Sequence, residues 1–505
     1  NVTTSGAFTA TGTTTIAAGK TLATASVADG SVGTYNIGVN RVAGGAMQIA
    51  KITESGDTAN YANDTINFQV AAGSAALTTG TIASVFTGNA GANITGTTVT
   101  DDSYLYNLTP VVNGNNIDVS VTFGNTINNT GTTSGNKNVG NVLLTTLVNS
   151  TNADINSLQD KLANATTAAA VNEILESAQP TIDGSTVTAM IDAAGAAQSI
   201  SETRMAAARS GDGLTGMAAG AEANGVSLWL QGFGTAAQQD TRGGIDGYDA
   251  DTFGGSIGID SGDIISGGII GVSFNYGKTD ADSKNANTTA TDIDSYGVNL
   301  YTSHDLGSQI FLNGQLGYAY NNIETARHNS TGPGSGTTAK GDTNSDQISA
   351  KVAIGRDYST DYGMTVTPTL SAAYTHLNTD GYTETGAGAL RVGDDKLNNL
   401  KLGFGLDTVW NLKNSDGSAM KPMIRVGYGY NAINDAVEIS SSFVGDAAAT
   451  AFASKGAKPA RSNFNAGVGL AYVTVADWDL SANYDYTFRT DYDAHSGTIR
   501  ATSRF

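Results

Sequence analysis

The stretch Asn463–Tyr472 has the sequence Asn-Phe-Asn-Ala-Gly-Val-Gly-Leu-Ala-Tyr, and Leu480–Phe488 has the sequence Leu-Ser-Ala-Asn-Tyr-Asp-Tyr-Thr-Phe. Apolar and polar side chains alternate in both, and a last segment, Gly497–Phe505, alternates again and ends on an aromatic residue. A period of two indicates a strand with two different faces. An apolar face with aromatic ends, opposite a face of Asn, Ser, Asp and Gly, is typical of a transmembrane β-barrel. Lipid admits such a sheet only if it closes on itself.

The same alternation returns throughout the second half of the chain. Nine further segments show it, and with the three above they make twelve, an even number as in bacterial barrels. We therefore predict an all-β fold class, with a 12-stranded antiparallel transmembrane β-barrel over 226–505. The nine segments are 226–231, 253–260, 270–276, 295–300, 312–320, 348–355, 366–374, 400–407 and 424–430.

The connections between these segments also alternate, in length. Short periplasmic turns and longer outer loops are typical of outer-membrane barrels, whereas a soluble all-β protein has no reason to sort its loops this way. The tight links lie near Ser261-Gly262, Asp305-Leu306, Ser359-Thr360, Asn414-Ser415 and Ala476-Asp477, and the longer ones near 235–246, 281–290, 325–341, 380–392 and 434–460. Pro368 falls in mid-strand, where we expect a bulge or an end of pairing.

Composition excludes several classes of protein. The 505 residues contain no Cys, so disulfides and cysteine-ligated metals are absent, and no apolar run reaches the roughly 18 residues of a membrane helix. The net charge is −20, and the 26 Lys and Arg are scattered, which argues against nucleic-acid binding. The chain begins at Asn1 without a basic and apolar leader, so we expect a removed signal peptide or a longer parent chain.

Residues 1–150 form a β-rich segment. Short apolar segments are separated by Gly, Asn and Asp, which indicates a β-solenoid or a sandwich. We favour the solenoid, because Thr and Asn could stack in ladders. Residues 103–121 predict a hairpin around Asn113-Gly114, and the Asn/Gly/Thr-rich residues 125–141 predict a loop.

Residues 151–225 predict a helical linker. Apolar residues recur at helical spacing until Pro180, and the segment from Ala193 to Arg209 is mostly Ala and Ser. A helix with such small side chains could lie inside a narrow pore. The alternative is a surface helix in a linker. The pore-helix candidates are Ile200, Glu202, Arg204 and Met205.

Charged side chains share the inward face of the predicted barrel. Toward lipid, an Arg or Lys at the midplane would cost about 2–4 kcal/mol, but inside the lumen charges can pair with one another or with a plug. The predicted lumen-facing charges are Lys351, Lys401, Asp407, Arg425, Asp485, Arg500 and Arg504.

Three patterns could form a catalytic or metal site, and each also has a purely structural interpretation. Gly254–Gly258 fits G-x-S-x-G, but it lies within a strand rather than between a strand and a helix. Asp493-Ala494-His495 could transfer protons, although a solvated loop histidine is the commoner case. Asp246, Asp249 and Asp251 could hold calcium but lack the full loop spacing, so we favour an acidic outer loop. We expect no catalytic residue, no bound metal and no cofactor.

Several motifs resemble a known family. Val226–Gly234 resembles the first strand of the translocator domain of bacterial type V autotransporters, and Asp246–Asp251, followed by Gly254 and Gly258-Ile259-Asp260, resembles the second. The most specific match is Pro368–Tyr374 followed by Asp380–Ala387. The resemblance covers about 226–505. Ala501 and Ser503 depart from it as weak outward residues, and 1–145 shows no protease or adhesin signature.

The resemblance implies a location and a mechanism. The barrel would sit in the outer membrane of a Gram-negative bacterium, an upstream passenger would pass outward to the cell surface, and a helix would remain in the lumen. Implied partners are outer-membrane lipid, the barrel-assembly machinery reading Phe505, and a host or neighbouring cell surface. The alternatives are a porin-like channel with a periplasmic N-terminal domain and an outer-membrane hydrolase.

Overall fold

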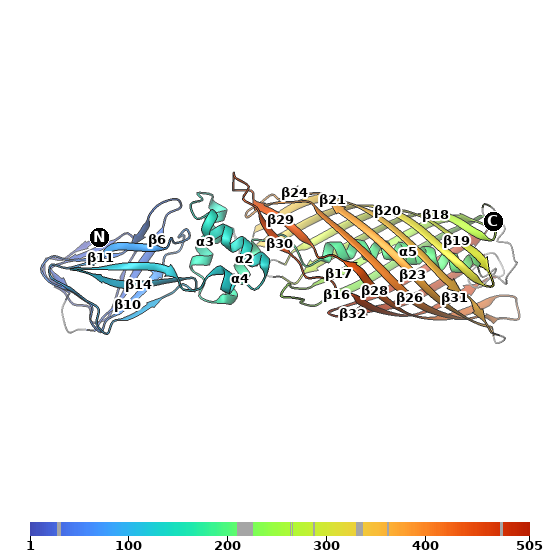
Figure 1. Ribbon diagram of the computed structural model, residues 1–505, viewed down its shortest axis with the longest axis horizontal. Helices are drawn as coiled ribbons and strands as arrows, with labels where there is room; N and C mark the ends of the chain where they lie inside the picture. The colour runs from blue at the N-terminus through green and yellow to red at the C-terminus, as the bar shows by residue number, and fades with distance from the viewer. Residues whose placement is uncertain are drawn as a thin grey trace.

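Three parts follow one another along the molecule (Figure 1): a β-rich N-terminal part, a group of helices and a long barrel. The computed structural model describes residues 1–27, 32–209, 226–262, 264, 266–285, 288–329, 337–360, 363–474 and 478–504.

The N-terminal part is a solenoid built from parallel strands. Strands about 20 to 30 residues apart stack in register, so each turn of the chain lies on the one before. One column contains β1 (Val2–Thr3), β4 (Thr21–Thr24), β8 (Lys51–Glu54) and β11 (Gly80–Thr87); another contains β3 (Thr13–Ile16), β6 (Thr34–Arg41), β10 (Thr65–Val70) and β13 (Thr98–Asp101). The third side consists of two pairs, β2 (Ala7–Phe8) with β5 (Ser26–Val27) and β9 (Ala59–Asn60) with β12 (Ala92–Asn93); β7 (Met47–Ile49) lies antiparallel to β6. The solenoid interpretation is confirmed.

A polar ladder runs across the turns of the solenoid. Asn36 Nδ2 donates to Thr15 Oγ1 at 3.2 Å, Asn67 Nδ2 donates to Asn36 Oδ1 at 3.2 Å, and Thr100 Oγ1 donates to Asn67 Oδ1 at 3.0 Å. Neighbouring positions on the same strands point inward, where Ile37 and Phe68 are fully buried. Because the same kind of side chain recurs at the same register, polar groups satisfy one another on one face while the core forms on the other.

The predicted hairpin closes this part. β14 (Tyr106–Asn113) and β15 (Asn116–Phe123) pair around Gly114, whose φ of +62° suits glycine, and β15 lies antiparallel to β11. The solenoid core continues without a break into the helices and reaches the barrel loops.

Helices begin earlier than the sequence pattern indicates. They are α1 (Ile127–Thr130), α2 (Ser134–Asn141), a π-helical turn η1 (Val142–Thr146), α3 (Ala153–Ala163) and α4 (Ala168–Ser177). The prediction of a loop over 125–141 is therefore wrong. The Thr133 side chain caps α2 by accepting from Asn136 N, and Val139 is fully buried, so tertiary packing outweighs the poor helix propensity of Asn and Gly.

Twelve antiparallel strands close the barrel, as predicted. They are β16 (Val226–Gln239), β17 (Tyr248–Ser261), β18 (Gly268–Ser283), β19 (Ala290–Gly307), β20 (Ile310–Asn329), β21 (Thr337–Arg356), β23 (Met364–Thr379), β26 (Asp395–Trp410), β28 (Ala419–Asn434), β31 (Ser462–Val473), β32 (Trp478–Arg489) and β33 (Tyr492–Arg504). β16 pairs with β33 and β21 with β23, which completes the ring. Leu230 points outward and is 60 % exposed, whereas Trp229 points inward and is 1 % exposed.

Pro368 interrupts pairing on one side only. It pairs with Leu406 of β26, but the ladder to β21 ends at Thr369 and resumes at Val366 with the short strand β22 (Tyr358–Ser359). Since proline has no N–H to donate, the expected end of pairing is found there. A second short strand, β27 (Leu412–Lys413), extends the sheet beside β28.

The outer loops contain more regular structure than predicted. β20 runs to Asn329 and β21 begins at Thr337, so most of the loop expected over 325–341 is strand. Both faces of those strand ends are polar, which removes the alternation that would have revealed them. The links over 380–394 and 435–461 form a separate sheet, hereafter the loop sheet, of β24 (Tyr382–Thr383), β25 (Leu390–Val392), β29 (Glu438–Phe443) and β30 (Phe452–Lys455).

Among the described residues, no helix combines the length and the apolar character that a membrane span requires.

Candidate functional site: a helix held inside the barrel

A single long helix, α5 (Ser185–Arg209), lies inside the barrel (Figure 1). It packs mainly against β17, β18, β19 and β20. Its last residue, Arg209, donates to Ser303 Oγ at 3.0 Å and to Asn313 Oδ1 at 3.1 Å, close to the short link between β19 and β20. The helix therefore enters at the end with the long loops and reaches the end with the short turns, and the predicted pore helix is confirmed.

Arg204 is the best-anchored residue of this helix. Its Nε donates to Asp260 Oδ2 and its Nη2 donates to Asp260 Oδ1, both at 2.7 Å, and the two side chains are 4 % and 2 % exposed. Asp260 Oδ2 also accepts from Tyr301 Oη at 2.8 Å, and Tyr301 Oη accepts from Trp229 Nε1 at 2.8 Å. Helix and wall are thus joined by a bidentate charged pair, and Tyr301 gives its carboxylate a further hydrogen bond.

Apolar contacts surround this polar chain. Ile200 and Met205 are buried in a cluster with Trp229, Phe233 and Tyr301. The rings of Trp229 and Tyr301 have room because glycines lie beneath them. A Cβ at Gly258 would fall 2.2 Å from Trp229 Cζ2. The glycines of the strand pattern therefore let aromatic rings lie flat against the wall beside the helix.

Several other polar groups along α5 are held by the wall at successive heights. Glu202 pairs with Lys351 at 2.8 Å. Further contacts are Asn299 Nδ2 to Ser201 Oγ at 2.7 Å, Gln315 Nε2 to Gln198 O at 3.2 Å, Gln347 Nε2 to Met190 O at 3.2 Å, and Tyr492 Oη to Asp192 Oδ2 at 2.7 Å. All four predicted pore-helix residues thus lie on α5, and each contacts the wall or its cluster.

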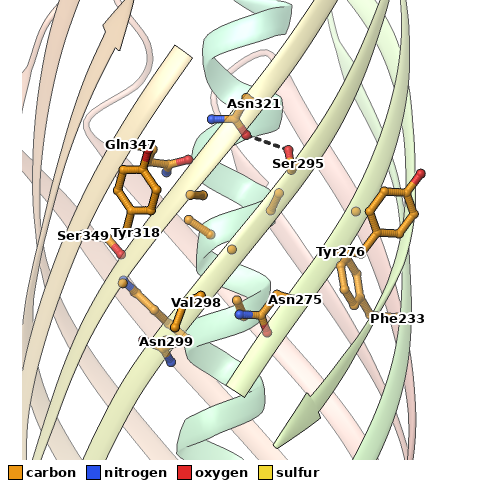
Figure 2. A pocket seen from close by; sticks show the side chains of 18 residues that line it. Phe233, Asn275, Tyr276, Ser295, Val298, Asn299, Tyr318, Asn321, Gln347 and Ser349 are labelled. Atoms are coloured by element: carbon orange, nitrogen blue, oxygen red, sulfur yellow. Dashed lines mark hydrogen bonds between the residues drawn. The ribbon is translucent and has the colours of Figure 1, made fainter. Parts of the chain in front are cut away.

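A small cavity of about 50 Å³ remains between the helix and strands β18 to β21. Figure 2 shows Asn299, Asn321 and Gln347 beside the helix, with Ser295 Oγ donating to Asn321 Oδ1 at 2.7 Å. The cavity is too small for a drug-sized ligand, which needs about 300–1,000 Å³. Asn299 and Gln347 hold the helix through Ser201 Oγ and Met190 O, whereas Asn321 donates to Ser345 O of the wall.

The remaining predicted lumen charges differ in their exposure and in their partners. Arg425 and Asp485 pair at 3.5 Å, and Lys401 and Asp407 lie on the inward face of β26, exposed to the lumen. Arg500 is 2 % exposed on the inward face of β33, opposite Gln231 and Ser481. The side chain of Arg504 and the whole of Phe505 lie outside the described residues.

The possible chemical motifs do not come together. Ser256 of the G-x-S-x-G pattern lies within β17, not at a strand-to-helix turn. His495 faces outward, with Nδ1 2.6 Å from Tyr484 Oη and Nε2 3.6 Å from Asp493 Oδ2. Within the described ranges, no three His, Asp or Glu side chains are arranged to ligate a metal directly.

The three acidic residues that we considered as calcium ligands lie in different surroundings. Asp249 pairs with Lys284 at 2.8 Å, and Asp251 lies exposed on β17 opposite Asp280. Asp246 instead lines a cavity under α4 together with Glu173, Glu176 and Asp183. Sequence reasoning missed this second grouping, because two of its members come from the helices and two from segments that flank or enter the barrel.

A comparison with protein families decides the class of this barrel. The family described as "Autotransporter beta-domain" matches residues 228–485, just over half of the chain. The chain belongs to this family. The resemblance drawn from the strand motifs is confirmed, and the autotransporter barrel lies in the outer membrane.

Curated relatives of this autotransporter match about half of the chain. Outer membrane protein B of Rickettsia prowazekii is 25 % identical over 308 residues, 58 % of this chain and 18 % of the relative. The uncharacterized protein YaiT of Salmonella typhimurium is 25 % identical over 234 residues, 46 % of this chain and 22 % of the relative. The chain spans about a fifth of the length of these relatives.

Solved translocator structures resemble the autotransporter barrel. The translocator domain of NalP from Neisseria meningitidis aligns with 62 % of this chain and 98 % of its own, at 17 % identity and a TM-score of 0.47. The transport unit of AIDA-I from Escherichia coli covers 58 % of this chain and 93 % of its own, at 14 % identity and a TM-score of 0.39.

Proposed function

We propose that the barrel carries the N-terminal solenoid through the outer membrane and holds it at the cell surface. One observation carries the proposal. α5 enters the lumen at the end with the long loops and ends near the short turns, so the solenoid and helices lie on the side of the long loops. In outer-membrane barrels that side faces outward, and the part of the chain before α5 is therefore outside.

We propose further that the displayed solenoid serves as an adhesin or a structural coat and has no catalytic role. Its repeated ladders give a long, stiff surface suited to contact with a host or neighbouring cell. Outer-membrane lipid and the barrel-assembly machinery are the other proposed partners, the latter through the last strand. The motifs that would serve a hydrolase are separated in the fold.

Protease treatment of intact cells tests this orientation. We expect residues 1–150 to be removed while fragments of 226–505 survive, and a periplasmic marker protein should stay intact as the control. If 1–150 is cleaved only after the outer membrane is broken, the N-terminal part is periplasmic and the proposal fails.

A passive channel is the second candidate function, favoured by one observation. α5 packs mainly on one wall of the barrel, while Lys401 and Asp407 on β26 stay exposed to the lumen. Single-channel recording of the purified chain distinguishes the two. Low conductance that rises strongly when 185–209 is deleted shows that α5 is a plug. High conductance with α5 in place shows a porin-like function.

A further inference from the structure

Two kinds of contact hold α5 in the lumen, and they differ in how much they depend on its sequence. Gln315 Nε2 donates to Gln198 O, and Gln347 Nε2 donates to Met190 O, each at 3.2 Å. Both acceptors are main-chain carbonyls, which every residue of a helix has. These two contacts could therefore form with the helix in other registers as well.

The contact between Arg204 and Asp260 depends on one particular side chain. Both side chains are buried, and the two hydrogen bonds between them, each 2.7 Å long, require the planar fork of a guanidinium. In the same register, Ile200 and Met205 enter the buried cluster around Trp229. The specific contacts of the helix thus converge at the height of Asp260.

Asp260 has a suitable partner in one register of the helix. A slide of α5 by one turn, about 5.4 Å, would replace Arg204 by a neighbour one turn away. These neighbours are Ile200, Ser201, Ala207 and Ala208. None of them carries a charge, so Asp260 would lie buried without a cation after a slide in either direction. Arg209 cannot replace Arg204, because five residues along a helix rotate a side chain by about 140°.

The rest of the N-terminal half contains few groups that could compete for Asp260. Between Lys161 and Arg204 the sequence has neither Lys nor Arg, and residues 1–203 contain one guanidinium, that of Arg41. The basic residues of 1–203 are Lys20, Arg41, Lys51, Lys137 and Lys161. This part of the chain can therefore cross the lumen with little competition for the carboxylate that binds Arg204.

We propose that Arg204 is the positioning residue of the exported chain, and that its pairing with Asp260 sets the register in which α5 stays in the lumen. This inference rests on the proposed export of the solenoid. The covalent link to the barrel does not set the register alone. Sixteen residues connect Arg209 to Val226, and a chain of that length can span far more than one helical turn. The pairing thus decides which residues end inside the barrel.

Cross-linking of cysteine pairs measures the register, since the chain has no cysteine of its own. Asn299 Nδ2 donates to Ser201 Oγ at 2.7 Å, so Ser201→Cys with Asn299→Cys reports the native register. Met205→Cys or Ala197→Cys, each with Asn299→Cys, reports a shift of one turn in one direction or the other. A short bifunctional thiol reagent is applied to the full chain in outer membranes. Without further substitutions, we expect the first pair to be linked and the other two to remain unlinked.

Further substitutions then test the role of the charged pair. Arg204→Ala and Asp260→Asn should each lower the native cross-link, relative to the two shifted ones, by about tenfold. Arg204→Lys keeps the charge without the fork, and its pattern should lie between those of Arg204→Ala and the parent. Thr203→Ala is the control, because Thr203 Oγ1 donates to Ser199 O within the helix. Heat-modifiable mobility on gels confirms that each chain is folded.

An unchanged cross-linking pattern in folded Arg204→Ala and Asp260→Asn chains overturns the inference, as does an equal change in Thr203→Ala. Protease treatment of intact cells separates this failure from a failure of the proposed function. If 1–150 of the parent chain is not removed from outside, export itself is contradicted. If 1–150 is removed and the pattern stays unchanged in the variants, the positioning role of Arg204 alone is contradicted.

Discussion

Arg327 on β20 and Glu384 form an ion pair at 2.5 Å, with each side chain 2 % exposed, where the barrel wall meets the loop sheet. The same guanidinium donates to Ser177 O, at the end of α4, at 2.6 Å and to Gly388 O at 3.0 Å. One side chain thus joins barrel, loop sheet and helices. Other contacts of the interface are Asn138 Nδ2 to Ala453 O and Gly388 N to Asp154 Oδ2.

Arg327→Ala should detach the helices from the barrel mouth. Removing one partner leaves Glu384 buried and unpaired, which costs roughly 3–5 kcal/mol. Hydrogen exchange should rise in 168–177 and 382–392 while the barrel strands stay protected. Lys455→Ala is the control, because the Lys455–Glu438 pair is 49 % and 57 % exposed; equal exchange in both variants would contradict this role.

Breaking the Arg204–Asp260 pair should release α5 from the wall. Asp260→Asn leaves the Arg204 charge buried, and we expect a loss of about 3–5 kcal/mol. Lys351→Met removes a more exposed pair and should cost about 0–1 kcal/mol. Unfolding in urea, followed by tryptophan fluorescence, measures both. Similar losses in the two variants would show that Arg204 does not dominate.

Gly258→Ala should disturb the helix through the wall. The new Cβ would collide with Trp229, and overpacking of this kind costs about 1–3 kcal/mol. Gly255→Ala is the matched control, since its nearest contact would be Gln231 O at 3.5 Å. Thermal unfolding compares the two, and the second change Trp229→Phe should restore part of the loss. A tolerated Gly258→Ala would show that Trp229 can move at no cost.

The stability of the helices on the barrel mouth should fall as pH rises. The pKa of Glu176 is raised in the folded state from 4.5 to about 7. The folded form therefore binds the proton more tightly, and its stabilisation is full below about pH 4.5 and lost as pH rises through about 7. Partial exposure limits the effect to about 2 kcal/mol. Protease cleavage of 164–183 across pH 5–8 measures it, and Glu176→Gln should abolish the dependence.

Changes of charge should be tolerated differently on the two faces of the last strands. Leu480 is 51 % exposed on the outer face, so Leu480→Arg should cost about 2–4 kcal/mol and block insertion. Arg500→Leu alters the inward face and should leave most chains folded. Heat-modifiable mobility of membrane fractions reports both, and equal losses would overturn the assignment of the faces.

Much of this fold could be predicted because a membrane barrel repeats one simple pattern. Alternation placed Leu230 outward and Trp229 inward and located all twelve strands. It could not predict that Arg204 meets Asp260, because a pair 56 residues apart depends on the register of helix against wall. Glu202 and Lys351 were both named as candidates and pair at 2.8 Å. Their pairing could not be predicted either, because it depends on the same register.

Where the two faces of an element are alike, the sequence carried less information. Residues 127–141 look like a loop because Asn and Gly dominate them, yet burial of Val139 against the neighbouring helices decides their helical form. Asp246, Asp249 and Asp251 look alike in sequence. Only the fold shows that Asp246 alone turns toward the carboxylates of α4.

The uninterrupted core, from the solenoid through the helices to the loop sheet, has a mechanical consequence. Tension applied to the solenoid by an attached surface reaches the rim of the barrel along two parallel paths. One runs through the backbone into α5, and the other runs through Leu390, Val392 and Phe443, which belong to the same buried cluster as Val139 and Leu143. The second path ends on the barrel wall itself, so the load is shared by the rim before it reaches the helix in the lumen.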